Sequence, residues 1–149
     1  MQLEFTGKEE VKSPLPLTSK FLSTPEDLAK SIPEAEEVKV LSEDEFEAKV
    51  KVKISVISST MKVRMKVLKS DGNTINLHAT SSGTGSSVEI KTQFNLSATN
   101  SHTSINWKAD VSISGLIAGL GSSTLKVFAE KYIRQIVANL HEQLEKKTA

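Results

Sequence analysis

The sequence predicts an α+β domain in which one long helix near the C-terminus lies across a curved, seven-stranded antiparallel sheet. Between residues 121 and 147, apolar residues recur at steps of three and four and cover about half of a helix circumference. Between residues 37 and 113, apolar and polar residues alternate, which is typical of strands with one buried and one wet face. The apolar residues of the helix form a broad stripe along one side of it, which needs a broad apolar partner. The helix is therefore expected to pack on the sheet, and any ligand would lie between helix and sheet.

The chain before this sheet is expected to form one strand and two short helices. Residues 3–11 have the composition of a strand, in which Gly7 suggests a bulge or a bend. The two helices are expected over residues 16–23 and from residue 25 up to Pro33. Thr24 is the expected N-cap of the second helix, and Asp27 is expected to return a hydrogen bond to it.

Six further strands follow from the alternation, over residues 37–40, 46–56, 61–67, 75–79, 88–96 and 105–113. Their register would be set by four turns, Ser58-Ser59, Ser70-Asp71-Gly72, Gly83-Thr84 and Asn100-Ser101. Each of these turns places apolar faces opposite apolar faces. Phe94 would then face Trp107, and one apolar row would cross five strands through Val52, Met65, Leu77, Ile90 and Val111.

The composition is that of one globular domain over residues 1–149, with 38% hydrophobic and 25% charged residues. No apolar run reaches the roughly 18 residues of a membrane span, and the N-terminus lacks the pattern of a signal peptide, so a cytoplasmic location is expected. The absence of cysteine excludes disulfides, thiolate metal sites and cysteine nucleophiles. The net charge of +1 predicts no general attraction to nucleic acid.

Two stretches of the sequence are similar to a known family, that of the carbon monoxide dehydrogenase G-subunit. The first runs from Leu22 to Leu28 and continues in Ile32-Pro33, and the second is the glycine-rich junction from Ile113 to Gly121. That family belongs to the START and birch-pollen-allergen-like (SRPBCC) superfamily, whose fold is the helix-grip fold. Glu34 stands where the family is expected to have a glycine.

The resemblance implies a non-catalytic protein that holds an apolar ligand, a lipid or an isoprenoid quinone, in a cavity between helix and sheet. It also implies a partner, a molybdenum-containing hydroxylase of the carbon monoxide dehydrogenase type, which the protein would serve in maturation, recruitment or quinone transfer. Peripheral contact with the inner face of the membrane would fit such a role.

The cavity is expected to have apolar walls with a few polar groups, Thr92, Thr103 and Tyr132, to orient a ligand. Its predicted lining residues are Val52, Met65, Leu77, Ile90, Thr92, Phe94, Trp107, Val111, Leu125, Phe128, Ala129 and Tyr132. Ala129 is the smallest residue near the centre of the helix stripe, so space is expected opposite it. The competing interpretation is a filled core, which would make the protein a structural interaction module.

The sequence offers no evident catalytic, metal or cofactor site. His78 and His102 fall on outward-facing strand positions, His141 falls on the polar face of the helix, and no pair of acids shares the inner face. Gly115, Gly119 and Gly121 lack the spacing of a phosphate-binding loop and fit a tight bend between strand and helix. An enzyme of the cyclase or lyase type, which the superfamily includes, remains the alternative function.

One outer hairpin face is unusually basic. With Ser58-Ser59 as its turn, Lys53 would face Arg64 and Lys51 would face Lys66, and such like-charge pairs are destabilising. This face is either a solvated surface that prevents edge aggregation or a docking patch for an acidic protein or an anionic membrane. The residues of the predicted patch are Lys51, Lys53, Lys62, Arg64 and Lys66.

Overall fold

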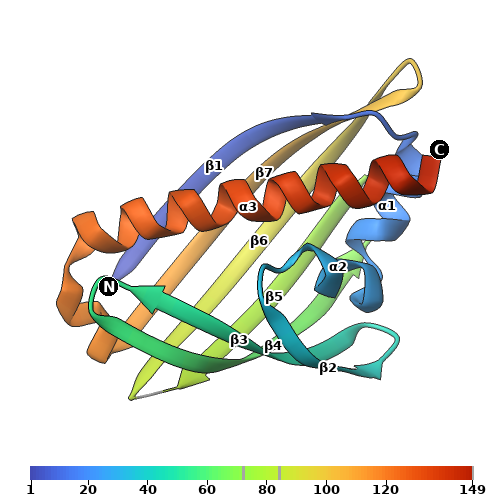
Figure 1. Cartoon of the computed structure of the whole chain (residues 1–149). Helices are drawn as coiled ribbons and strands as arrows, with labels where there is room; N and C mark the ends of the chain where they lie inside the picture. Colours follow the sequence, from blue (N-terminus) through green and yellow to red (C-terminus); the bar gives the residue numbers. More distant parts are fainter. Residues whose placement is uncertain (72, 84, 149) are drawn as a thin grey trace.

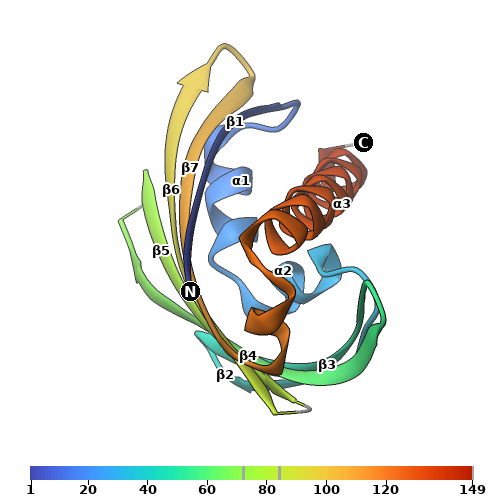
Figure 2. The same cartoon turned by 90° about the vertical axis from the view of Figure 1, so that its left-hand side faces the viewer.

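A strongly curved antiparallel sheet wraps around one long helix in the computed structural model of the chain (Figure 1). The structure describes residues 1–71, 73–83 and 85–148. The sheet has seven strands in the order β1-β7-β6-β5-β4-β3-β2, so the first strand pairs with the last. The predicted fold class is therefore confirmed, with the long helix α3 on the concave side of the sheet (Figure 2).

The elements follow the expected order. The strands are β1 (Gln2–Val11), β2 (Ala35–Ser42), β3 (Glu45–Ile54), β4 (Ile57–Ser70), β5 (Thr74–Gly83), β6 (Ser86–Thr99) and β7 (His102–Gly115). The helices are α1 (Leu15–Leu22), α2 (Pro25–Ser31), the short 3₁₀ helix η1 (Leu116–Leu120) and α3 (Ser122–Thr148). Gly115 and Gly121 flank η1 with φ angles of 88° and 89°, a left-handed backbone that glycine adopts without strain. These two glycines make the bend between strand and helix that their spacing suggests.

The strand register agrees with the prediction in one hairpin and differs in three. Ile90 faces Val111 and Phe94 faces Trp107, as the Asn100-Ser101 turn requires. The β3–β4 turn is Ser55-Val56, since Ile54 pairs with Ile57, so the expected Ser58-Ser59 turn is wrong. Val56 lies at the tip of this hairpin and is 92% exposed, although the alternation predicts it on the inner face.

The other two differences concern β5. Met65 faces Ala79 instead of Leu77, and Leu77 faces Thr92 instead of Ile90. Gly83 pairs with Ser86 and Ser70 pairs with Ile75, so both residues belong to strands and not to the predicted turns. Thr84 and Gly72, which are also predicted in these turns, lie outside the described residues. Both differences shift the partner by two residues, so Met65 and Leu77 stay on the inner side of the sheet. Near the β4–β5 turn the register shifts by one further residue, between Val67 and Lys69.

Two residues near the N-terminus have roles that the sequence does not predict. β1 pairs with β7 without any register shift, so Gly7 marks no bulge; a Cβ atom at this position would lie 2.4 Å from Cζ2 of Trp107. Gly7 therefore makes room for the indole ring. The Thr24 hydroxyl makes no cap hydrogen bond with α2 and donates instead to the Lys20 carbonyl at 2.5 Å, which ties α1 to α2. Asp27 pairs with Lys147 of α3, at 3.4 Å.

Two separate hydrophobic clusters form the core. The first includes buried residues of α1, α2 and the sheet and the C-terminal part of α3, where Leu140 and Leu144 are 6% and 0% exposed. The second, around Leu125 and Ile117, joins the start of α3 and η1 to the sheet. Trp107 packs against both clusters. The helix is thus held firmly at its two ends.

Candidate functional site

Between its two ends, α3 is only partly buried on the side that faces the sheet. Phe128, Ala129 and Tyr132 are half-buried, as are Ile133, Ile136 and Val137. The sheet residues of the central region show the same partial burial, although they have inward parity: Val52, Val63, Met65, Ile90, Thr92, Phe94 and Trp107. In the dense core of a small protein such side chains are normally inaccessible to water. Solvent therefore reaches an apolar inner surface between helix and sheet.

The structure distributes the predicted lining residues over both core clusters. Leu77, with Met65, Phe94 and Trp107 packed nearby, lies in the first cluster. Val111 and Leu125 are buried members of the second, against which Val52, Ile90, Phe128 and Ala129 also pack. Leu77, Val111 and Leu125 are the three buried members, so they belong to the walls behind the accessible surface. Val63 is a further residue of this surface, and its inward parity on β4 would have identified it from the sequence.

Tyr132 is the main polar group on the inner side of α3. Its ring stacks on Phe128 at a centroid distance of 5.7 Å, and its hydroxyl points to the Pro33 carbonyl at 3.5 Å. Burial, with a smaller contribution from the charge of Glu34, raises the pKa of Tyr132 to about 12. The phenol is therefore neutral at physiological pH and acts as a hydrogen-bond donor, not as a base.

The end of α2 and the loop after it close one side of this interior against the helix. Asn139 of α3 donates to the carbonyl of Ser31, the last residue of α2, at 3.0 Å, and Tyr132 reaches the Pro33 carbonyl in the loop. Glu34 has a φ angle of 56°, in the left-handed region that favours glycine. The resemblance noted in the sequence predicts a glycine at this position.

One ionisable pair lies at the β1 edge of the inner side. The Glu9 carboxylate and the His141 ring nitrogen are 3.8 Å apart, with side chains 28% and 32% exposed. The sequence predicts His141 on the wet face of the helix, and its half-burial comes from this contact with β1. His78 is on the outer face beside Glu89, at 3.1 Å. Among the described residues, no cluster of histidine or acidic side chains could hold a metal ion.

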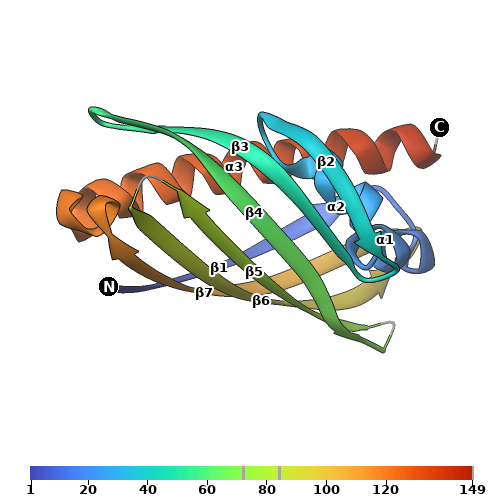
Figure 3. The same ribbon diagram turned by 90° about the horizontal axis from the view of Figure 1, so that it is seen from below.

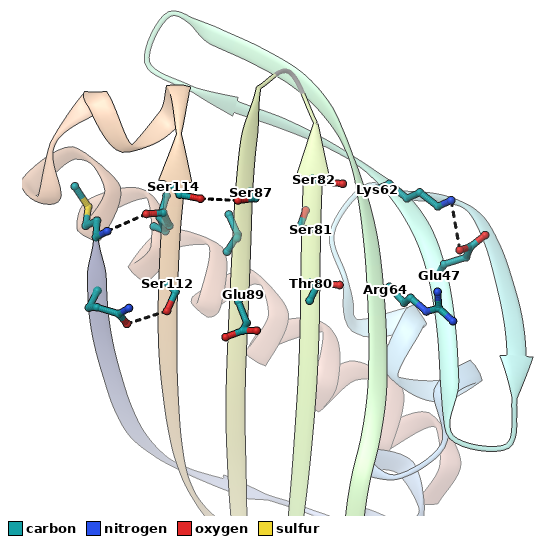
Figure 4. A pocket seen from close by; sticks show the side chains of 14 residues that line it. Glu47, Lys62, Arg64, Thr80, Ser81, Ser82, Ser87, Glu89, Ser112 and Ser114 are labelled. Atoms are coloured by element: carbon teal, nitrogen blue, oxygen red, sulfur yellow. Dashed lines mark hydrogen bonds and ion pairs between the residues drawn. The ribbon is translucent and has the colours of Figure 1, made fainter.

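A polar hollow of about 640 Å³ lies on the outer face of the sheet, away from α3 (Figure 4). Its walls carry hydroxyl groups from β5, β6 and β7 and the charged residues Lys62, Arg64, Glu47 and Glu89. Several of these groups bond to one another, as Ser87 does to Ser114 at 2.6 Å and Ser112 to Gln2 at 2.9 Å. Because its walls are mainly polar and charged, the hollow does not suit the expected apolar ligand.

The predicted arrangement of the basic hairpin is wrong because its turn lies elsewhere. Lys53 faces Ser58, Lys51 faces Thr60 and Lys66 faces Glu45. Three of the patch residues form ion pairs with acids on neighbouring strands, Lys51 with Glu36 at 3.3 Å, Lys62 with Glu47 at 3.6 Å and Arg64 with Glu45 at 2.6 Å. The outer face of β3 and β4 thus alternates in charge.

Comparison with solved structures places this architecture among the START-like helix-grip proteins. A conserved protein from Geobacillus kaustophilus matches with a TM-score of 0.86 at 18% identity, covering 97% of this chain and 96% of that one. The Zhui aromatase/cyclase from Streptomyces sp. R1128 matches with 0.72 at 13% identity, covering 100% and 97%. A START superfamily protein from Mycobacterium smegmatis matches with 0.71 at 14% identity, covering 96% and 97%.

The family follows from the sequence itself. The model of the carbon monoxide dehydrogenase G-subunit (CoxG) family matches residues 7–145, and the chain belongs to this family. No protein in the curated set matches the chain. No helix of the described residues is long and apolar enough to cross a membrane. Family and fold together indicate a ligand-binding accessory protein.

Proposed function

We propose that this protein binds an apolar, lipid-like or quinone-like molecule between α3 and the inner face of the sheet. The observation that carries the proposal is the partial burial of the inner apolar surface between two sealed ends, from Phe128 to Val137 on the helix and from Val52 to Trp107 across the sheet. Covering such a surface with an apolar ligand is favourable by about 25 cal/mol per Å² removed from water.

The polar groups at this surface fit a binding role. The neutral Tyr132 hydroxyl and the Thr92 side chain can orient one polar group of a ligand, such as a quinone carbonyl. A catalytic role would need an acid or base of suitable pKa next to the ligand. Glu9 and His141, the ionisable pair on this side, lie at the edge of the sheet with their side chains 3.8 Å apart.

The partner in this proposal is a molybdenum-containing hydroxylase of the carbon monoxide dehydrogenase type, as the family description suggests. The protein would support maturation or recruitment of that enzyme, or carry a quinone between the enzyme and the membrane. The predicted patch, with Lys53 and Lys66 outside the ion pairs recorded for the described residues, remains a candidate docking surface for the enzyme.

Two measurements test the ligand. Mass spectrometry of organic extracts, from protein purified without detergent, should find a stoichiometric lipid or quinone. A fluorescence titration of the delipidated protein with quinone and fatty-acid analogues should quench or shift the emission of Trp107, which is the only tryptophan and packs against both core clusters. An empty extract together with unchanged Trp107 emission would exclude the proposed function.

A further inference from the structure

The two edge strands of the sheet differ in how well they are protected against pairing with a further strand. β2, the last strand in the sheet order (Figure 3), is irregular, because its register against β3 shifts between Glu36 and Lys39 and again after Val40. Glu37, within the first of these shifts, has a φ angle of 50°. Irregularities of this kind keep another strand from pairing with an edge. β1 has neither device, since it pairs with β7 without a register shift and includes no proline.

The main-chain groups of every second residue of β1 point away from the sheet. Met1 and Ile113 exchange both main-chain hydrogen bonds, at 2.9 and 2.8 Å. In an antiparallel pair such bonded positions alternate with unbonded ones, so the odd-numbered residues from Leu3 to Val11 bond to β7. The N–H and C=O groups of the even-numbered residues are therefore directed outward. These residues, which are all exposed and which we call the free edge of β1, are Gln2, Glu4, Thr6, Lys8 and Glu10.

The helix α3 runs beside β1 in the same direction (Figure 1). Leu125 packs in the same cluster as Phe5, and His141 lies 3.8 Å from Glu9 further along both elements. Val127 precedes His141 by about four helical turns and so lies on the same side of α3. Its side chain is 67% exposed. A strand added to β1 would therefore meet an aliphatic side chain of α3 with its own inward-facing side chains.

The side chains of the free edge define the charges of a matching strand. Glu4, Lys8 and Glu10 follow one another as acid, base and acid. Glu4 pairs with Lys108 at 3.6 Å, whereas Lys8 and Glu10 belong to no ion pair recorded for the described residues. Opposite charges directly across an antiparallel pair are stabilising, and like charges are destabilising. The matching strand therefore carries basic residues opposite Glu4 and Glu10 and an acidic residue opposite Lys8.

A second copy of this chain does not fit the free edge. The two-fold axis of an antiparallel pairing between two copies of β1 would be perpendicular to the sheet, so both copies of α3 would lie on the same face. Each α3 would be close to that axis, because it runs beside its own β1 on the concave side (Figure 2). Paired strands are about 4.8 Å apart, whereas packed helices need about 8–10 Å. The two helices would collide, which favours a segment of a different protein.

We propose that β1 is a docking edge for an extended segment of another protein, which pairs antiparallel with it as an eighth strand and turns inward side chains towards Val127. The five residues of the free edge would give this segment about ten main-chain hydrogen bonds. The inference goes beyond the proposed ligand and does not depend on it, because the free edge lies outside the inner apolar surface.

The test uses a short synthetic peptide of alternating polar and aliphatic residues, with lysine opposite Glu4 and Glu10 and glutamate opposite Lys8. Amide hydrogen exchange of the full chain, followed by NMR, reports each main-chain N–H separately. In the free protein, the amides of the free edge should exchange fast and the odd-numbered amides of β1 slowly. Saturating peptide should slow exchange at Glu4, Thr6 and Lys8 by about tenfold or more and leave the odd-numbered amides unchanged. A peptide with the three charges inverted should bind about tenfold more weakly.

Two variants separate main-chain pairing from charge. Thr6→Pro removes an outward N–H and no hydrogen bond to β7, and proline is tolerated on an edge strand where its nitrogen faces solvent. It should weaken peptide binding by at least about tenfold, whereas Thr6→Val keeps the N–H and should bind as wild type does. Lys8→Glu should weaken binding of the first peptide and strengthen binding of a peptide with lysine opposite position 8. Thermal unfolding establishes that each variant is folded.

Three outcomes would overturn the proposal: a peptide that leaves exchange at the free edge unchanged, equal binding by Thr6→Pro and Thr6→Val, or an affinity that ignores the charge opposite position 8. Slow exchange at the even-numbered amides without peptide, increasing with protein concentration, would also overturn it, because the free edge would then belong to a second copy.

Discussion

Trp107 and Gly7 show how one residue sets the volume available to another. The indole ring occupies the place above Gly7 on the neighbouring strand, where a Cβ atom would approach three ring atoms at 2.4, 2.5 and 2.7 Å. The sequence could not reveal this, because the neighbour of Gly7 is a residue far along the chain and depends on the β1–β7 register. From the sequence alone, Gly7 suggests a bulge. In the folded protein, Gly7 leaves room for the Trp107 ring.

Replacing Gly7 with alanine should move the Trp107 ring and destabilise the protein by about 1–3 kcal/mol, as expected for an overpacked core. Denaturant unfolding followed by Trp107 fluorescence measures both effects, because the protein contains one tryptophan. Gly119→Ala is the control, since no atom lies within 4 Å of a Cβ there. The control should change stability by less than about 0.5 kcal/mol, and equal losses in both variants would contradict the packing argument.

Tyr132 predicts a pH dependence at alkaline pH. Its pKa is about 12 in the folded protein, against the ordinary value of 10.0, because burial disfavours the phenolate. The contribution to stability is complete below pH 10, where both states are protonated, and is lost as the pH rises towards 12, where the unfolded state ionises first. The protein has one tyrosine, so ultraviolet titration of tyrosinate should give the raised midpoint directly. Tyr132→Phe should lose this alkaline component, and a midpoint near 10 would contradict the burial of the hydroxyl.

At the scale of elements, α3 is stabilised chiefly by its ends. Leu144 is 0% exposed in the first cluster and Leu125 is 2% exposed in the second, whereas the middle of the helix is half-buried. Leu144→Ala should therefore cost about 2–5 kcal/mol. Val127→Ala, at a position 67% exposed on the same helix, should cost far less. Thermal unfolding measures both, and similar costs would contradict the two-ended attachment.

Removal of the whole helix extends this prediction. A chain that stops before Gly121 loses the buried contacts of Leu125, Leu140 and Leu144 together. Its cooperative thermal transition should disappear, because the loss exceeds the usual stability of about 5–15 kcal/mol of a small domain. A truncated protein that unfolds as sharply as wild type would refute the role assigned to α3.

The strands show which parts of the fold the sequence could predict. The period of two determines which face of a strand is buried, and the predicted inner faces are found on β3 to β7. The prediction fails for β2, an edge strand on which Val38 and Val40 are 43% and 45% exposed. Register depends on the turn, and Ser55-Val56 carries no glycine or asparagine to mark it, whereas Asn100 adopts the left-handed φ of 55° that marks the β6–β7 turn. The polar contacts of α3 with β1 and α2 are His141 with Glu9 and Lys147 with Asp27. The sequence could not predict them, because they join segments that only the tertiary structure brings together.

At the scale of the whole molecule, the sequence could identify the apolar inner side but not its accessibility. Parity and helical periodicity gave the residues of the inner surface, and the same residues would line a filled core. Whether solvent enters depends on how far the two end clusters hold α3 from the central strands, which is a property of the complete fold. Ala129 is half-buried in this region, beside the second cluster.

Ala129→Phe separates a vacant interior from a filled one. In a vacant interior the ring occupies free volume, so the ligand-free protein should melt at the same temperature or higher and should lose the binding of quinone or fatty-acid analogues. In a filled interior the same change would destabilise the protein by about 1–3 kcal/mol. Ala138→Phe, on the exposed side of α3, is the control for adding a ring to this helix. A clear drop in melting temperature, together with a parent protein that binds no analogue, would refute the proposed cavity.

The strand order has a consequence for how the chain reaches its native state. The strands from β2 to β7 are connected in sequence by short turns, so each can pair with the previous one as soon as it is formed. β1 must wait, because its partner β7 is separated from it by nearly the whole chain, with Gln2 facing Ser112. Contacts between such distant residues carry a large loop-closure entropy and slow folding. During synthesis, β1 therefore leaves the ribosome before the strand it pairs with and finds its partner last. Until then β7 is an open edge to which another chain can add a strand.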